Sequence, residues 1–459
     1  MIPAPRSDFQ KVKLSLHQGV KAAECNAPDR AQEIFRRALN EAKQLPNNTA
    51  GMLLRAVCIV KCLRNGKFSD TEFLENFNIL KENVEKLDCQ LSHQRDSHPY
   101  LDLLGTTYLY LYIFTTNKPY IKKAKDILVR VARNKAEEPK QPYPSPQARA
   151  QFDAFISAGL SCLYLFREEL DNSENDQIDI QPVLQAVSWF EKAFSIYPKS
   201  ESLIYLLGLS SALLDHLVSL QPPQYPQPPL QRSIEILHYK EDEKMPDPLQ
   251  RLFLLGVCQY RAAFNQNNPH QYELLTLGIQ AYDTLFRTYK GDSGDRSFKG
   301  DSQSLVFVAD SARWLYWMTR LPFYQQKAAF FIAQLKTSSP ASFLFQVVVK
   351  VYEIQNHLIK KTVDKIPALI DELRALLKTQ HDDSTVADSL LTNLREGITL
   401  ITTHFQKLKN LQEPEYDFLA TRLGNKINAL AIYSLSTNAI YKELNSYNQL
   451  PDLEESLIE

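Results

Sequence analysis

The stretch Ser188–Gly208, SWFEKAFSIYPKSESLIYLLG, decides the fold class of this chain of 459 residues. A helical apolar pattern ends at Tyr197 and Pro198, a short polar turn follows, and a second helical pattern then includes Gly208. Proline cannot continue a helix because it lacks the backbone N–H. A glycine inside a helix costs roughly 1 kcal/mol relative to alanine. The stretch therefore predicts two helices and a glycine that needs a structural reason.

The same helical periodicity continues along almost the whole chain. Helical apolar segments alternate with short polar turns, which is typical of an all-α protein. Glycine is scarce at 13 residues, whereas a fold with many tight β-turns usually needs more. The predicted helices span residues 8–25, 29–45, 49–64, 69–91, 100–116, 120–134, 145–170, 182–197, 202–220, 247–265, 270–289, 304–320, 323–336, 342–360, 365–379, 385–411 and 416–447.

The composition is that of an ordinary globular protein, with 44% hydrophobic and 23% charged residues. Lys and Arg total 52 against 53 Asp and Glu, so a nucleic-acid partner is not expected, because phosphate binding is driven by basic residues. The sequence shows no apolar leader and no apolar run long enough to cross a membrane. The six cysteines lie on apolar helical faces and are expected to be free thiols. We therefore expect a soluble, cytoplasmic protein without a membrane span.

The opening stretch resembles the tetratricopeptide repeat family, whose unit is 34 residues long. In that family a Leu-Gly pair in the first helix is followed by Ala, an aromatic residue, Ala and Pro in the second. The matching residues are Ala186, Phe190, Ala193 and Pro198, followed in the next unit by Leu207 and Gly208. Degenerate copies are Gly19 with Phe35, Gly105 with Leu128, and Gly256 with Tyr282, and the resemblance covers roughly residues 8–290.

The resemblance implies a superhelical solenoid of helix pairs, each of which buries its apolar face against the next. Small residues would let neighbouring helices approach closely. Phe190 is expected to fill the groove between them, and Gly208 to admit the preceding helix pair. Beyond the repeats, we expect the solenoid to continue into a C-terminal helical bundle.

Two changes of composition divide the chain. Gln221–Gln231, QPPQYPQPPLQ, is interpreted as a non-helical strap or hinge, with a ligand for an aromatic-lined groove as the alternative. Lys290–Ser302 repeats KGDS and is expected to be a flexible loop. The predicted domains are residues 8–220 with N-terminal repeats, 221–231 as the strap, 232–290 as a further helix pair, 291–302 as the loop and 303–450 as a C-terminal helical region.

The sequence carries no convincing catalytic or cofactor motif. Gly291–Gly294, GDSG, resembles the tetrapeptide around a protease nucleophile, but that chemistry needs a β-barrel, so catalysis by its serine is not expected. Cys58 and Cys62 share one helix face and could begin a metal site with Cys89 or His93. Buried thiols are favoured because a second closely spaced pair of ligands is missing. We predict no catalytic residue, no metal and no cofactor.

The resemblance also implies a concave groove lined by first-helix side chains that flank the Leu-Gly positions. Members of the family that clamp acidic tails use Lys, Asn and Arg there, whereas these positions are mostly apolar or aromatic in this sequence. The groove therefore suits an apolar peptide or helix, or is filled by the chain's own C-terminal helices, and the sequence leaves both open. The candidate partner-binding residues are Asp102, Tyr110, Tyr205, Phe253, Tyr260 and Arg261.

Ala312–Leu335 is the densest aromatic region of the chain. We interpret it as a core between two helices. An aromatic docking surface is the alternative, because Trp, Tyr and Arg dominate binding hot spots. Its candidate residues are Trp314, Trp317 and Phe323.

The predicted function is that of a non-enzymatic adaptor, scaffold or regulator that binds a peptide or helix of a partner protein. The alternative is a secreted bacterial effector, acting in a host cytosol, or another enzyme on a helical scaffold. Its site would lie in residues 303–450, which do not match the repeat. A helical-repeat RNA-binding protein is the least favoured, because the net charge is close to zero.

Overall fold

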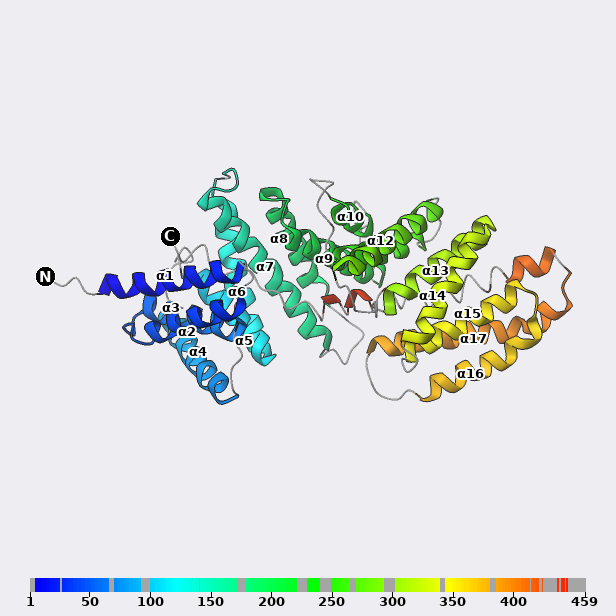
Figure 1. Ribbon diagram of the computed structural model, residues 1–459, viewed down its shortest axis with the longest axis horizontal. Coiled ribbons are helices and arrows are strands. Elements are labelled where there is room, and N and C mark those ends of the chain that lie inside the picture. The colour runs from blue at the N-terminus through cyan, green and yellow to red at the C-terminus, as the bar shows by residue number, and fades with distance from the viewer. Residues whose placement is uncertain are drawn as a thin grey trace. The chain divides into compact units, whose positions relative to one another are not determined.

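The secondary structure is helical throughout the described part of the chain (Figure 1). The computed structural model describes residues 5–24, 27–65, 70–91, 100–139, 141–171, 179–220, 229–239, 249–264, 270–292, 302–338, 343–379, 385–412, 414–420, 423, 436, 439–441 and 443–444. No strand occurs in these ranges, which confirms the predicted all-α class. Within the same ranges, no helix is both long enough and apolar enough to cross a membrane.

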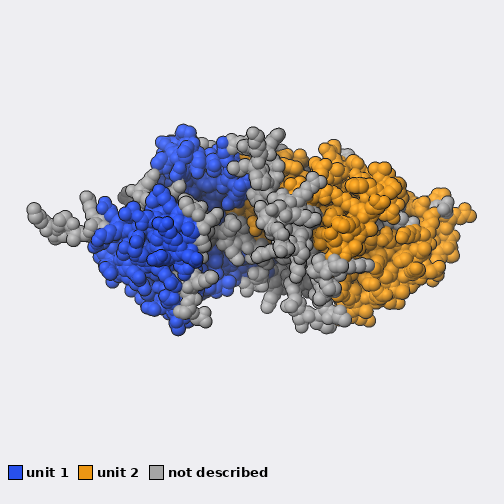
Figure 2. Space-filling view, viewed as in Figure 1, with its two compact units in different colours: residues 1–203, 447–459 blue, residues 204–446 orange. Residues whose placement is uncertain are grey.

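The chain forms two compact units, which Figure 2 shows in different colours. The first unit comprises Met1–Leu203 and Tyr447–Glu459, and the second comprises Ile204–Ser446. The division therefore lies inside one helix, α9 (Glu201–Leu220). The domain boundaries that the sequence suggests stay predictions.

The first unit is a series of helix pairs. Helix α1 packs on α2, α3 on α4, α5 on α6 and α7 on α8, and contacts between consecutive pairs join the series. This arrangement is the helical-repeat array expected from the sequence. The helices are α1 (Pro5–Glu24), α2 (Pro28–Ala42), α3 (Thr49–Asn65), α4 (Asp70–Leu91), α5 (Leu101–Thr115), α6 (Lys118–Glu137), α7 (Pro146–Asp171) and α8 (Gln181–Ile196).

The second unit is also a series of packed helices and ends in a bundle with a core of its own. We call α15, α16, α17 and residues 414–423 the C-terminal bundle, because their apolar side chains form one cluster from Val347 to Leu423. The remaining bounds are α10 (Pro229–Leu237), α11 (Leu249–Ala263), α12 (Gln271–Asp292), α13 (Ser302–Thr319), α14 (Pro322–Ser338), α15 (Phe343–Ile359), η1 (Val363–Lys365), α16 (Ile366–Thr379) and α17 (Thr385–Asn410).

Helix α10 corrects the interpretation of the proline-rich stretch. Its first residue is Pro229, so residues 229–231 of the expected non-helical strap are helical. Proline is tolerated in the first turn of a helix, because the backbone N–H there has no intrahelical partner to lose. Residues 221–228 of the strap and 293–301 of the expected loop lie outside the described residues, while residues 290–292 belong to α12.

Five helices carry a glycine whose missing side chain makes room for a large one from another helix. A Cβ atom placed on any of these glycines would lie 2.4–2.8 Å from the nearest atom of that side chain, which is too close for a real contact. In three of the pairs both residues belong to one degenerate copy of the repeat pattern. The pairs are Gly19 with Phe35, Gly105 with Leu128, Gly159 with Phe190, Gly208 with Leu237 and Gly256 with Tyr282.

One of these pairs agrees with the expected role of Phe190, and another differs from the expectation for Gly208. Phe190 of α8 fills the space beside Gly159 of α7, the helix that precedes it. Gly208 of α9 receives Leu237 of α10, the helix that follows it, rather than admitting the preceding pair. The expected role of Gly208 in close packing is correct, but its partner is different, because α10 was not predicted.

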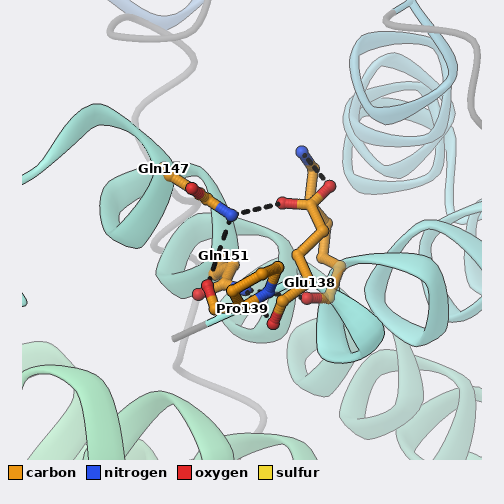
Figure 3. Close-up of polar contacts among 5 residues, drawn as sticks. Glu138, Pro139, Gln147 and Gln151 are labelled. Atoms are coloured by element: carbon orange, nitrogen blue, oxygen red, sulfur yellow. Dashed lines mark hydrogen bonds and ion pairs between the residues drawn. The ribbon is translucent and has the colours of Figure 1, made fainter. Parts of the chain in front are cut away.

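Glutamine side chains join the end of α6 to the start of α7 (Figure 3). The Nε2 atom of Gln151 donates hydrogen bonds to the carbonyl oxygens of Lys135 at 2.9 Å and Glu138 at 3.3 Å. The Nε2 atom of Gln147 donates to the carbonyl oxygen of Pro139 at 3.3 Å. The Lys135 oxygen also accepts from the backbone N–H of Glu138 at 3.3 Å, so the glutamines add side-chain donors where the helical ladder ends.

The contact between Gly159 and Phe190 can be tested by adding one methyl group. We expect Gly159→Ala to destabilise the first unit, because its Cβ would lie 2.4 Å from the Phe190 ring. Overpacking of this kind costs about 1–3 kcal/mol in the free energy of unfolding, measured by urea denaturation. The second-site change Phe190→Leu should recover part of that loss.

Gly278→Ala in α12 is the matched control. The nearest atom would lie 3.7 Å from its Cβ, which is an ordinary contact. Because alanine has the higher helix propensity, we expect this substitution to stabilise the protein by up to about 1 kcal/mol. Equal losses of stability in the two variants would contradict the packing role of Gly159.

Candidate partner-binding face

The six predicted groove residues fall into two sets, one in each unit. Asp102 and Tyr110 lie on α5 of the first unit. Tyr205 lies on α9 of the second unit, and Phe253, Tyr260 and Arg261 lie on α11. Their role in partner binding stays a prediction, and the structure shows what each side chain contacts within the chain.

Asp102 is an unusual carboxyl group in the first turn of α5. Its Oδ1 atom is buried and has no hydrogen-bond partner. Burial raises the pKa of Asp102 to about 6, and the positive charge of Lys135 opposes this shift. Tyr110 is buried on the same helix, with its ring centroid 6.3 Å from that of Phe114.

The four residues of the second unit are buried rather than open to solvent. The exposed fractions of Tyr205, Phe253, Tyr260 and Arg261 are 6%, 5%, 1% and 2%. Phe253 packs near Tyr282, whose ring centroid is 6.4 Å away. An open apolar groove at these positions is therefore not what the isolated chain presents.

The part of α9 around Tyr205 is covered by residues near the end of the chain. We call Ser436, Ala439–Tyr441, Glu443 and Leu444 the C-terminal segment, and each of these residues is helical. The hydroxyl group of Tyr205 donates a hydrogen bond to the carboxylate of Glu443. The ring of Tyr441 meets that of His216 edge to face, with 5.6 Å between centroids. In Figure 1 the segment is drawn in red beside α9.

Five of the described residues of the C-terminal segment share one helical stripe, and the buried Tyr441 lies off it. Ser436, Ala439, Ile440 and Leu444 are buried, with exposed fractions of 0–2%. With Glu443 they occupy positions i, i+3, i+4, i+7 and i+8, the spacing of a single helical stripe. The sequence left open whether a partner or the chain's own C-terminal helices cover the groove, and in this structure the chain's own residues lie on α9.

A buried ion pair lies next to the covered part of α9. The Nε atom of Arg261 is 3.2 Å from Oδ2 of Asp215, and the exposed fraction of the Arg261 side chain is 1%. The guanidinium group also contacts the Nδ1 atom of His216 at 3.4 Å. Burial and the neighbouring Arg261 charge lower the pKa of His216 to about 3, so the imidazole that faces Tyr441 is neutral near pH 7.

The polar contacts continue from α11 to α13. The hydroxyl group of Tyr260 donates to Oδ2 of Asp310 at 2.6 Å. The other oxygen of Asp310 accepts hydrogen bonds from the Arg313 guanidinium at 2.6 and 3.1 Å. The guanidinium group lies 5.6 Å from the ring centroid of Trp314. The buried charges are therefore paired, as buried ionised groups need to be.

The predicted aromatic region contains both core and surface residues. Trp314 is buried and packs on Phe264, with 5.0 Å between ring centroids. Phe323 is 63% exposed and Phe330 is 58% exposed. The side chain of Trp317 lies outside the described residues. The core interpretation therefore fits Trp314, while Phe323 is on the surface.

Cys58 and Cys62 are buried, as expected, whereas Cys89 is exposed. Burial raises the pKa of the Cys62 thiol to about 12. A thiol must lose its proton to bind a metal, so this environment disfavours ligation. In the described ranges, no group of three or more His, Cys, Asp or Glu is placed to hold a metal ion. His93 and the second half of the GDSG tetrapeptide lie outside them.

Several residues that contact the predicted site residues were missed by sequence reasoning. Asp310 and Arg313 have the spacing of an i, i+3 ion pair within an apolar helix, and that spacing was the available signal. Tyr441 and Glu443 lie in a predicted helix that carried no feature pointing to α9. Only the folded chain brings Glu443 to Tyr205, since the two are 238 residues apart.

Comparisons with known proteins add little to this description. No protein-family model matches the sequence, and no curated protein matches it. A solved structure titled "Crystal Structure of the Apo Form of RapI" is similar, with a TM-score of 0.48 and 11% sequence identity over 91% of this chain and 98% of that chain. The structure shows a helical-repeat array, and its assignment to the tetratricopeptide family stays a prediction.

His216 should make the stability of the second unit dependent on pH. The unfolded chain takes up a proton near the ordinary histidine pKa of about 6.5, whereas the folded chain does so only near pH 3. Its contribution to stability is therefore full above about pH 6.5 and is lost as the pH falls toward 3. We expect His216→Gln to reduce the loss of stability between pH 6.5 and 4 by on the order of 1–3 kcal/mol.

Urea denaturation across this pH range measures the effect. Burial raises the pKa of Asp215 despite Arg261, so Asp215 contributes a pH dependence of the opposite sign. The quantity to compare is therefore the pH dependence of the free energy of unfolding in the variant and in the wild type. His270, with a side chain 70% exposed, supplies the control His270→Gln. If both variants showed the same pH profile as the wild type, the buried, neutral state of His216 would be wrong.

Asp102 should make the first unit less stable as the pH rises, which is opposite in sign to the effect of His216. Its folded pKa of about 6 lies above the ordinary value, so the folded chain binds the proton more tightly and stability falls as the pH rises from about 4 to 6. We expect Asp102→Asn to raise the melting temperature by about 2–6 °C at pH 8 and to change it little at pH 4. The exposed Asp126 gives the control Asp126→Asn, and an equal gain there would contradict the effect of burial.

Proposed function

We propose that the chain is a non-enzymatic adaptor, scaffold or regulator that binds a helical segment of a partner protein on the face of α9 that includes Tyr205. The observation that supports it is the hydrogen bond from the Tyr205 hydroxyl to Glu443, together with the contact between His216 and Tyr441. This face accepts one amphipathic helix already. Laying the apolar stripe of a helix on a complementary surface is a common mode of protein recognition.

The chemistry of the face suits such a ligand. A tyrosine hydroxyl beside a carboxylate fixes the register of the bound helix, because the hydrogen bond is directional. Aromatic residues give large contact area at low cost in side-chain entropy, which is why they are frequent at binding hot spots. The buried pair of Arg261 and Asp215 keeps the adjacent part of the face neutral and fixed.

The enzyme alternative has no specific observation in its favour. In residues 303–450, Asp310 pairs with Arg313. Lys350 likewise lies 3.3 Å from Glu353 and also pairs with Glu372. The core of the C-terminal bundle is apolar. These groups are used in structural ion pairs rather than directed toward a common point.

The test uses a charge on the proposed face. Proteins that co-purify with the full-length chain from its native cells are identified and purified, and the affinity of each is measured by calorimetry. We expect Tyr205→Glu to weaken binding at least tenfold, because it removes the donor and places a like charge where the ligand carboxylate lies. Tyr205→Glu also removes the hydrogen bond that holds Glu443 of the C-terminal segment. A weaker affinity for the partner would therefore not be explained by tighter binding of that segment to the same face.

Phe330→Glu is the matched control, since Phe330 is an exposed aromatic residue of the same unit. It should leave the affinity unchanged. Circular dichroism and the melting temperature establish that both variants are folded. A partner that binds the Tyr205→Glu variant as tightly as the wild type would show that another surface carries the interaction.

A further inference from the structure

We propose that the C-terminal segment is a built-in competitor of the partner, and that the partner helix carries the same stripe of small, aliphatic and carboxylate residues. This inference rests on the proposed function and adds the regulation of the face and the chemistry of its ligand. In the resting chain the segment occupies the face. Binding of the partner requires that the segment leave it.

The first argument is that the core of the C-terminal bundle is formed without the segment. The apolar cluster of the C-terminal bundle runs from Val347 to Leu423 and includes no described residue of the segment. The ion pair of Arg261 with Asp215 joins α11 to α9 and uses no atom of the segment. The described bundle core and the contact between these two charges are therefore formed without the segment.

The second argument concerns the tether. Leu423 is packed in the core of the C-terminal bundle, and Ser436 follows it by 13 residues (436 − 423) in the sequence. A ligand that belongs to the same chain competes at an effective concentration that does not depend on the protein concentration. While the segment occupies the face, it reduces the apparent affinity of any other ligand of that face.

The third argument is the pattern of the segment itself. Ala439 and Ile440 form one turn of the stripe, and Glu443 and Leu444 form the next. The small residue allows close approach, the aliphatic residues are buried, and the carboxylate accepts the hydrogen bond from Tyr205. A competing helix needs a carboxylate three residues after an aliphatic residue, followed directly by another aliphatic residue.

The experiment measures binding of the chain's own segment in trans. The probe is a fluorescent synthetic peptide of residues 431–447, AIYSLSTNAIYKELNSY. The released chain is the full-length protein with Ile440→Asp and Leu444→Asp. We expect it to bind the probe at least tenfold more tightly than the wild type. Glu443→Gln, a milder change, should give an intermediate affinity and faster hydrogen exchange in residues 436–444.

Two controls separate specific binding of the probe from binding to a partly unfolded chain. Phe418, which is 70% exposed in the C-terminal bundle, gives Phe418→Asp, and this variant should bind the probe as weakly as the wild type. A probe in which alanine replaces the residue at position 443 should bind the released chain several-fold more weakly than the original probe. That second result would follow from loss of the carboxylate that accepts from Tyr205.

Two outcomes would overturn the inference. One is equal, weak probe binding by the wild type and by a folded released chain. The other is global unfolding of the released chain with unchanged exchange in Glu443→Gln, which would make the segment a fixed part of the fold. If a partner is lost on Tyr205→Glu while the probe never binds, only this inference fails. If the probe binds but no partner depends on Tyr205, the proposed function fails.

Discussion

The contact of a helix glycine with a large side chain of another helix is the constraint on which both units depend. Without a Cβ atom on the glycine, the two backbones approach closely and the large residue fills the remaining space. The same device recurs in α1, α5, α7, α9 and α11. In the second unit it seats α10 against α9, and Ser233 of α10 donates a hydrogen bond to the carbonyl oxygen of Gly208 at 2.7 Å.

Polar contacts then specify how the helices of the second unit are arranged. Arg261 and Asp215 join α11 to α9, and Tyr260 with Asp310 joins α11 to α13. Burying ionised groups is expensive, so these contacts are poor candidates for net stabilisation. Their geometric requirements are strict, however, because a displaced helix would leave a buried charge unpaired. We interpret them as determinants of a single arrangement of the three helices.

The sequence was sufficient for the local structure and for part of the packing. Gly19 and Phe35 have the spacing of a compact repeat, so their contact could be predicted. Gly159 was overlooked because it lacks the preceding leucine of the motif. Helix α10 was overlooked because prolines concealed its first turn.

The candidate site was harder to predict than the fold. The four buried residues of the second unit were found because they flank Leu-Gly pairs, which is a local signal. What covers Tyr205 has no local signal, since Glu443 is 238 residues away and ordinary for a surface helix. Apolar and aromatic side chains at a groove also look the same whether the ligand is a partner or the chain itself. Only the folded chain distinguishes these cases.

The long separation between Tyr205 and Glu443 has a consequence for biosynthesis. Chains are elongated at about 5–20 residues per second, so the 238 residues between them take roughly 10–50 s to synthesise. During that interval α9 has left the ribosome while the segment that covers it does not yet exist. Until the segment is synthesised, it cannot cover the Tyr205 face of α9 on any nascent molecule.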